Sequence, residues 1–210
     1  MSKQLRLVYL GDIVGRSGRE ILKSTIPSLK EKYKYDLLVV NAENSAGGRG
    51  ISPKIADELF TAGVDFMTLG DHVWDEKKII PYLENNSQKI IAPANLAQAE
   101  AGKGYAIIEH DGIKIAFCNM LGRVFMNLSA DCPFQKITKL LKNELSGVKV
   151  KILDFHAEAT SEKYAMFRYL TGKMSLIVGT HTHVPTADQQ ISGGTGYVTC
   201  LLYTSDAADE

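Results

Sequence analysis

Five short apolar runs of this chain each end directly in a group of acids, amides or histidines. Each run has the composition of a β-strand. The runs are Leu5–Leu10, Leu37–Val40, Phe66–Leu69, Val150–Leu153 and Leu176–Val178. The polar groups that follow them are Gly11-Asp12, Asn41-Ala42-Glu43-Asn44, Gly70-Asp71-His72, Asp154-Phe155-His156 and Gly179-Thr180-His181-Thr182-His183. In open α/β sheets, ligands bind beyond the carboxyl ends of the strands. The pattern therefore predicts that side chains spread from Asp12 to His183 meet at one edge of the fold.

Helical signals alternate with these strands. Ser52-Pro53 combines a capping serine with proline at the first helical position, and Gly63 is typical of a helix end. Further helices are expected over Glu20–Tyr33, from an Asp75 cap through Leu83, from Pro133 to about Leu145, and over Ser161–Leu170. Repeated βα units predict a largely parallel sheet with helices on its faces.

Antiparallel strands are expected in the second half of the chain. Tyr105–Glu109 and Ile113–Asn119 flank His110-Asp111-Gly112, which has the character of a hairpin turn. A last strand is expected over Gly196–Cys200. The fold class is therefore α/β with a mixed arrangement of strands.

The composition is that of an ordinary globular protein. The 210 residues are 45% hydrophobic and 23% charged, which suits one domain. The 24 basic and 24 acidic residues balance, so no overall attraction to long nucleic acids or anionic membranes is expected. The sequence also lacks a membrane-spanning apolar stretch and a secretory segment, and its three cysteines are widely spaced. A cytoplasmic location is the expectation.

Six of the strand-end side chains have the chemistry of a metal site. They are Asp12, Glu43, Asp71, His156, His181 and His183. Three carboxylates and three imidazoles suit manganese, iron or zinc. One carboxylate can bridge two ions, and two ions roughly 3.5–4 Å apart form the usual clamp for phosphoryl displacement. A histidine outside the coordination sphere can then protonate the leaving oxygen.

The spacing of His181 and His183 allows two arrangements. On a strand, both side chains would lie on one face. On a loop just past the strand, they could reach adjacent metals.

Other interpretations of single residues stay open. Asp12 could belong to a phosphate loop with Gly15 and Gly18, although G-x-G-x-x-G is not present. Glu43-Asn44 could cap the following loop, and Asp71 could cap a helix. Arg123, which follows a predicted strand, could contact a phosphate or lie on the surface.

A zinc-deaminase interpretation is excluded. His156-Ala157-Glu158 matches the H-x-E pattern of those enzymes, but no P-C-x-x-C follows it. Glu158 is therefore expected to be structural rather than catalytic.

Taken together, the strand-end blocks resemble the calcineurin-like metallophosphoesterase superfamily. More narrowly, they resemble its bacterial branch of 2′,3′-cyclic-nucleotide phosphodiesterases. The blocks that carry the resemblance are Gly11–Gly15, Asn41–Asn44, Gly70–Asp75, Pro93–Asn95, Asp154–Lys163 and Val178–Val184. The resemblance implies an α/β sandwich of two mixed β-sheets flanked by helices. It also implies a dinuclear site of divalent or mixed-valence ions, with iron the first expectation and manganese or zinc the alternatives.

The resemblance also implies a role for each site residue. Asp12, Glu43, Asn44 and His183 would hold the first metal, and Glu43 would bridge to the second. Asp71, His156 and His181 would complete the second site. A bridging hydroxide would open a 2′,3′-cyclic nucleotide to a 3′-nucleotide, with His72 as the proton donor to the leaving ribose oxygen.

Two features depart from the family's pattern. The family usually has asparagine where this chain has Asp71, and an anionic ligand would bind a cation more tightly and lower the site's positive charge. The family also continues past the Gly196–Thr199 strand with Asp-Val-Gly and further strands. Residues 1–200 are therefore expected to form one metallophosphoesterase domain, incomplete at its C-terminal edge. Residues 201–210 are expected to be a disordered or foreign tail.

Two rival functions remain from the sequence. One is a metal-bound regulatory or binding module with little turnover. The other is a broader phosphomonoesterase or a nuclease on the same site, although the balanced charge argues against long nucleic acids. A small cyclic nucleotide is the expected partner, and the sequence leaves a homo-oligomer open.

Overall fold

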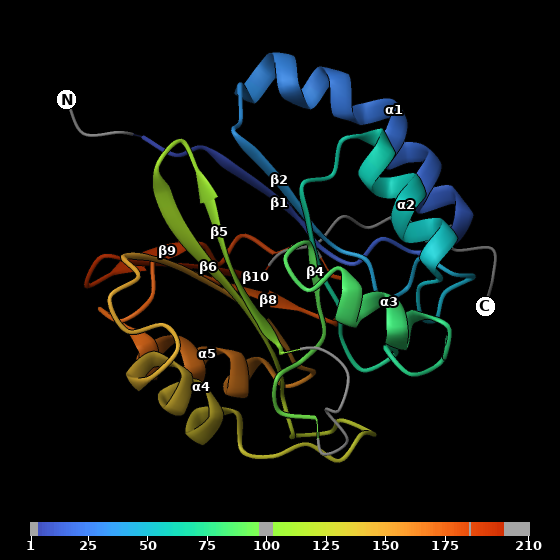
Figure 1. The fold of residues 1–210 in the computed structure, drawn as a ribbon. Helices are drawn as coiled ribbons and strands as arrows, with labels where there is room; N and C mark the ends of the chain where they lie inside the picture. The colour runs from blue at the N-terminus through green and yellow to red at the C-terminus, as the bar shows by residue number, and fades with distance from the viewer. Residues whose placement is uncertain (1–3, 97–102, 185, 200–210) are drawn as a thin grey trace.

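The strands form two β-sheets that pack face to face (Figure 1). The computed structural model describes residues 4–96, 103–184 and 186–199. The first sheet has the order β1-β2-β3-β4, with bounds Leu7–Leu10, Leu37–Asn41, Phe66–Thr68 and Ile90–Ile91. The second has the order β5-β6-β7-β8-β10-β9, with bounds Tyr105–His110, Ile113–Leu121, Val150–His156, Leu176–Thr180, Thr195–Thr199 and Gln190–Ser192.

Apolar side chains fill the layer between the two sheets. Leu37, Val39 and Phe66 of the first sheet share one buried cluster with Phe117 and Ile152 of the second. The rings of Phe66 and Phe117 stack with their centroids 4.2 Å apart. The layer is apolar because strand residues alternate between faces, and each sheet turns one of its faces to the other.

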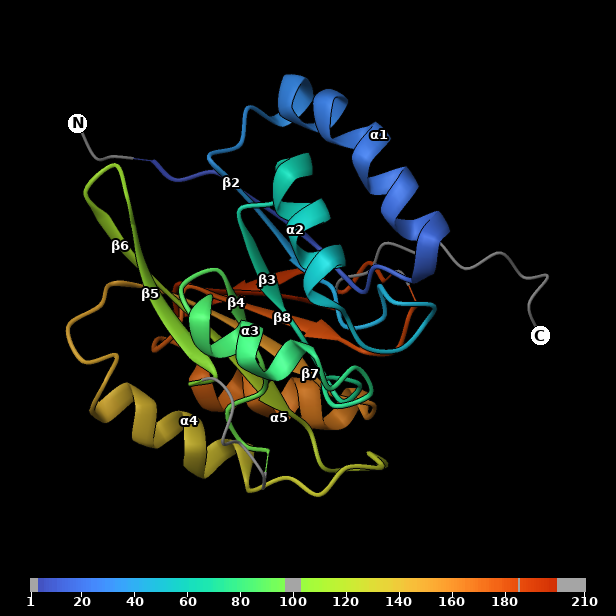
Figure 2. The same cartoon turned by 45° about the vertical axis from the view of Figure 1, so that its right-hand side comes forward.

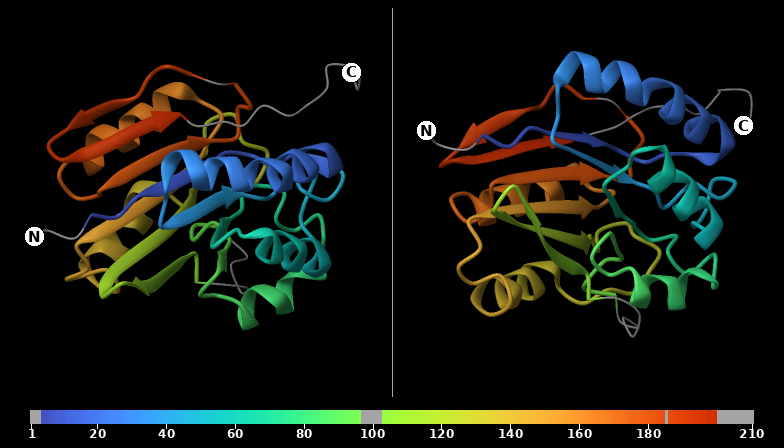
Figure 3. Two further views of the ribbon diagram at one scale, coloured as in Figure 1. Left: turned by 90° about the horizontal axis from the view of Figure 1, so that it is seen from above. Right: turned by 45° about the horizontal axis from the view of Figure 1, so that its top comes forward.

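Five helices of the described residues cover the outer faces (Figures 2 and 3). On the first sheet lie α1, α2 and α3, with bounds Gly15–Tyr33, Pro53–Ala62 and Ile79–Asn85. On the second lie α4 and α5, with bounds Pro133–Lys142 and Thr160–Leu170. The arrangement is a four-layered α/β sandwich, which confirms the predicted fold class.

One detail of the sheets differs from the expectation. The first sheet is parallel throughout its described strands, whereas two mixed sheets were expected. A helix follows each of β1, β2 and β3 and returns the chain to the same end of the sheet, so successive strands run in the same direction. The second sheet is mixed, because β5 and β9 pair antiparallel with their neighbours.

Local signals place α2 and the hairpin correctly. The Ser52 hydroxyl accepts a hydrogen bond from the Ile55 N–H at 3.3 Å, and Gly63 ends the helix in the left-handed conformation. The hairpin turn narrows to Asp111-Gly112, whose φ angles of 49° and 77° suit a two-residue connection.

Helix boundaries were predicted less well. Asp75 does not cap α3, because Lys78 occupies the N-cap and the Asp75 carboxylate instead contacts His72. The helix expected from Glu20 begins earlier, at Gly15, and α4 ends at Lys142 rather than near Leu145.

No helix within the described ranges is long and apolar enough to cross a membrane. Cys200 and the tail of residues 201–210 lie outside the described residues. The extent of the domain therefore stays a prediction.

Candidate metal centre

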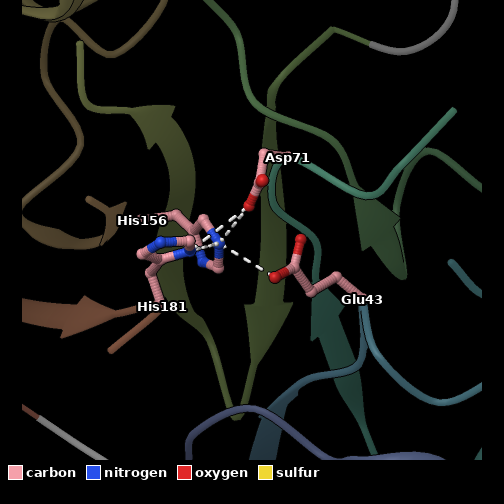
Figure 4. Close-up of side chains that lie close together, drawn as sticks. All are labelled: Glu43, Asp71, His156 and His181. Carbon is pink, nitrogen blue, oxygen red and sulfur yellow. Dashed lines mark hydrogen bonds and ion pairs between the residues drawn. The ribbon is translucent and has the colours of Figure 1, made fainter. Parts of the chain in front are cut away.

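The carboxyl ends of strands from both sheets meet at one point of the sandwich. Glu43 follows β2 and Asp71 follows β3, both in the first sheet. His156 is the last residue of β7, and His181 follows β8 in the second sheet. Figure 4 shows these four side chains pointing toward one another, and one ligand atom from each lies within 4.8 Å of all the others. The predicted convergence of distant strand ends is present for these four residues.

The closest approaches centre on the His156 ring. Its Nε2 lies 2.9 Å from Glu43 Oε1 and 3.0 Å from Asp71 Oδ1. His181 Nδ1 lies 3.3 Å from the same Asp71 oxygen and 3.2 Å from His156 Nε2. Two imidazoles and two carboxylates thus turn their metal-binding atoms to a common point, as a nitrogen and oxygen site for a divalent cation requires.

Gly70 makes this close approach possible. A Cβ at this position would lie 2.3 Å from Glu43 Oε2 and 2.4 Å from His156 Nε2. Any side chain would therefore fill the space in which the Glu43 and His156 side chains meet.

Asp12 joins the cluster from the end of β1. Its carboxylate is fully buried, and Oδ2 accepts a hydrogen bond from the His181 backbone N–H at 2.9 Å. His183 Nε2 lies 3.5 Å from the same oxygen, and His156 Nδ1 lies 3.9 Å from Oδ1.

Two buried oxygens of the predicted ligand set have no hydrogen-bond partner among the described residues. They are Asp12 Oδ1 and Asn44 Oδ1. The Asn44 side chain donates to the Gly48 carbonyl at 2.9 Å, which leaves its oxygen free to coordinate. A buried polar atom without a partner is costly, and a bound cation would satisfy both oxygens. The residues present therefore fit a metal centre.

The buried carboxylates and imidazoles of the site shift one another's pKa. Burial raises the pKa of Asp12 to about 7, with His156 lowering it and Glu43 raising it further. Burial lowers the pKa of His156, but Glu43 and the hydrogen bond with Asp71 raise it well above its ordinary value. Burial raises the pKa of Asp71, yet hydrogen bonds from His156 and His181 hold it well below its ordinary value. An imidazolium and a metal cation thus compete for the same carboxylates.

His181 and His183 lie on a loop beyond β8, not on the strand itself. Both adopt positive φ angles, 93° and 48°, which are unusual for residues with a side chain. Such strain persists where the surrounding structure imposes it, and it is concentrated at functional sites. The two rings consequently take different positions, with His181 beside Asp71 and His183 beside Asp12.

His72 borders the cluster. Its backbone N–H donates to Glu43 Oε2 at 3.1 Å, and its Nε2 lies 4.0 Å from Asp71 Oδ2. On the other side of the ring, Nδ1 lies 2.9 Å from the Asp75 carboxylate.

Arg123 is exposed beyond the end of β6, beside the strand that carries His156. Its backbone N–H is held by the buried Glu162 carboxylate at 3.0 Å. A role of the guanidinium group toward substrate stays a prediction.

Comparisons with known proteins cover the part of the chain that holds this site. A family model described as YmdB-like protein matches residues 8–205. The chain belongs to this family. A curated relative of the YmdB-like chain, the 2′,3′-cyclic-nucleotide 2′-phosphodiesterase of Bacillus subtilis (strain 168), is 40% identical over 196 residues. That match covers 93% of this chain and 74% of the relative.

Solved structures show the same YmdB-like fold. A crystal structure described as a novel phosphatase from Mycoplasma pneumoniae superposes with a TM-score of 0.89 and 37% identity, over 95% of this chain and 72% of that one. A hypothetical protein from Thermus thermophilus gives a TM-score of 0.85 and 35% identity, over 93% of this chain and 75% of that one.

The sequence predicted no part in the site for several polar residues that contact it, among them Glu158, which was expected to be structural. Asn41 Oδ1 accepts a hydrogen bond from the Glu43 backbone N–H at 3.1 Å and so fixes the start of the loop that follows β2. Glu158 lies 3.0 Å from His181 Nε2, on the ring edge away from the cluster. Thr180 contacts His156 Nδ1, the ring nitrogen that faces away from Glu43, and its hydroxyl donates to Asp154. The available signal was polarity within otherwise apolar strands, because buried polar groups need partners.

Proposed function

We propose that this protein is a metal-dependent phosphodiesterase that opens 2′,3′-cyclic nucleotides to 3′-nucleotides. The observation that carries the proposal is the meeting of Glu43, Asp71, His156 and His181 at one point. The activity of the Bacillus subtilis relative supports the substrate class.

The donor set supports two ions rather than one. Asp12, Asn44 and His183 would hold the first ion together with Glu43, and Asp71, His156 and His181 would hold the second with the same Glu43. The unsatisfied oxygens of Asp12 and Asn44 and the 3.5 Å approach of His183 to Asp12 support the first group. Two bound divalent cations would lower the pKa of a water molecule and neutralise the phosphate oxygens. Iron is proposed first, with manganese or zinc as alternatives.

His72 is proposed as the proton donor. Its Nδ1 faces Asp75, which leaves Nε2 on the side of Asp71 for the substrate. As a water molecule adds to phosphorus and gives up one proton, the bond from phosphorus to the ribose 2′ oxygen would break and His72 Nε2–H would protonate that oxygen. The proton given up by the water would restore the one lost by His72. The product keeps its phosphate on the 3′ oxygen. The exposed Arg123 is a proposed phosphate contact at the rim.

His72→Ala tests the donor role. We expect kcat for 2′,3′-cyclic AMP to fall by roughly 100-fold or more, since a general acid contributes about that much. Metal content, measured on the purified variant by elemental analysis, should stay that of the wild type. The matched control is His110→Ala at the end of β5, outside the cluster.

Unchanged turnover in His72→Ala would remove the proton-donor role. A substrate panel tests the reaction class in the same assay. Preference for phosphomonoesters over cyclic diesters, or release of the 2′-nucleotide, would contradict the proposed function.

A further inference from the structure

A buried carboxylate behind the metal centre has no place in the proposed ligand set. Asp154 lies on β7, two residues before His156, and is 1% exposed. Its Oδ2 accepts hydrogen bonds from the Tyr9 hydroxyl at 2.6 Å, from Thr68 Oγ1 at 2.5 Å and from Asn41 Nδ2 at 3.0 Å. These donors come from the opposite sheet, so Asp154 joins the two sheets directly under the site.

The other oxygen of Asp154 faces Thr180. The Thr180 hydroxyl donates to Asp154 Oδ1 at 2.5 Å, and the same hydroxyl oxygen lies 2.9 Å from His156 Nδ1. A threonine hydroxyl has one proton, and here it goes to the carboxylate. The oxygen can therefore only accept toward His156, which requires a proton on Nδ1.

Among the described residues, no other hydrogen-bond donor lies close enough to His156 Nδ1, with a proton not used elsewhere, to make Nδ1 an acceptor. Asn41 Nδ2 lies 3.5 Å from His156 Nδ1, but its two protons have nearer acceptors at Asp154 Oδ2 and the Leu69 carbonyl, at 3.0 and 3.4 Å. With Nδ1 protonated, the neutral His156 ring has its lone pair on Nε2. That atom is the one that faces Glu43 and Asp71.

We propose that Asp154 is a positioning residue that acts through Thr180 to keep His156 protonated on Nδ1, so that Nε2 is presented to the metal. The proposal rests on the metal centre of the proposed function and adds the groups that set its ligand geometry. A metal-bound histidine commonly donates its second N–H to an outer acceptor that fixes the tautomer and the ring orientation, and loss of that acceptor costs roughly 10–100-fold in metal affinity. The acceptor here is a hydroxyl that relays to a carboxylate shared by both sheets.

The chain offers a matched control within the same network. Thr68 and Thr180 are both buried, and both hydroxyls donate to Asp154 at 2.5 Å. The Thr180 hydroxyl also contacts His156, whereas the Thr68 hydroxyl contacts Tyr9 and Asp154. Thr180→Val and Thr68→Val therefore each remove one hydroxyl that donates to Asp154. Only Thr180→Val also removes the acceptor of the His156 Nδ1–H.

The test measures Mn²⁺ affinity by competition with a chelator for wild type, Thr180→Val, Thr180→Ser and Thr68→Val. We expect Thr180→Val to weaken binding by roughly 10–100-fold, and Thr68→Val and Thr180→Ser to stay within about twofold of wild type. Nitrogen-15 NMR of the metal-stripped protein at high pH should show the Nδ1–H tautomer of His156 in wild type and its loss in Thr180→Val. Thr180→Ala replaces the valine variant if that variant does not fold.

Wild-type affinity in a folded Thr180→Val or Thr180→Ala variant would overturn the proposal. So would an equal loss in Thr68→Val, because the effect would then come from the shared network and not from His156. Both readouts are independent of turnover. If wild type did not hydrolyse cyclic nucleotides, the proposed function would fail, but the metal affinities and the His156 tautomer would still test the role of Asp154.

Discussion

Buried ionisable side chains at the site couple the stability of the fold to pH. Asp12 has a pKa of about 7 in the folded protein, against an ordinary value of 3.8. Between these two values the folded state holds a proton on Asp12 that the unfolded state has released. The contribution of this proton to stability is complete below about pH 3.8 and is lost as pH rises through about 7.

We therefore predict that metal-stripped wild type loses melting temperature from pH 5 to pH 8 more steeply than Asp12→Asn. The substitution also removes the charge by which Asp12 raises the pKa of His156, so the difference between the two curves reports Asp12 together with its coupling to His156. Calorimetry without metal provides the measurement. Parallel curves for the two proteins would show that the Asp12 carboxyl titrates as in the unfolded chain.

Some residues of the site could be predicted from the sequence, and others could not. The proposed ligands Asp12, Glu43, Asp71 and His156 lie at strand ends, and strand ends can be recognised from local apolar runs. The proposed role of Asp154 could not be predicted in this way, because it depends on a contact with Thr180 of another strand, 26 residues away. Asp75 was assigned to a helix cap because its contact with His72 depends on a turn that no periodicity marks.

At the scale of elements, the ends of β2, β3 and β7 lie close together because one residue between them has no side chain. Gly70 connects β3 to Asp71, and its missing side chain leaves room for Glu43 after β2 and His156 on β7. A methyl group would overlap both ligands.

Gly70→Ala should therefore lose most of its bound metal while keeping its secondary structure. The reason is that Glu43 and His156 must separate to admit the new methyl group. Elemental analysis and circular dichroism provide the two readouts. Gly196→Ala in β10 is the control, because the nearest atom to its Cβ would lie at an ordinary 3.4 Å. Full metal content in Gly70→Ala would show that the ligands do not need this approach.

Elements differed in how well the sequence predicted them. Helix α2 was placed correctly because its start and end depend on Ser52 and Gly63, which act within one turn. The alternation of strands and helices predicted parallel pairing, which the first sheet shows throughout its described strands. The division of the strands into two sheets was implied only by the family resemblance, because no single strand sequence encodes it.

On the scale of the whole molecule, the apolar layer shared by the two sheets places strand ends of one sheet beside strand ends of the other. The stacked Phe66 and Phe117 and the polar contacts of Asp154 hold the sheets in this relation. The proposed ligands consequently come from both sheets, with Glu43 and Asp71 from one and His156 and His181 from the other. We infer that the packing of the sandwich is what assembles the site.

The most direct test is a titration of metal-stripped protein with Mn²⁺, with bound ions counted and hydrolysis of 2′,3′-cyclic AMP followed in the same samples. We predict two ions per chain at saturation, with 3′-AMP formed in proportion to their occupancy. A chain that binds no ion, or hydrolysis that continues unchanged in excess chelator, would contradict a metal-dependent phosphodiesterase.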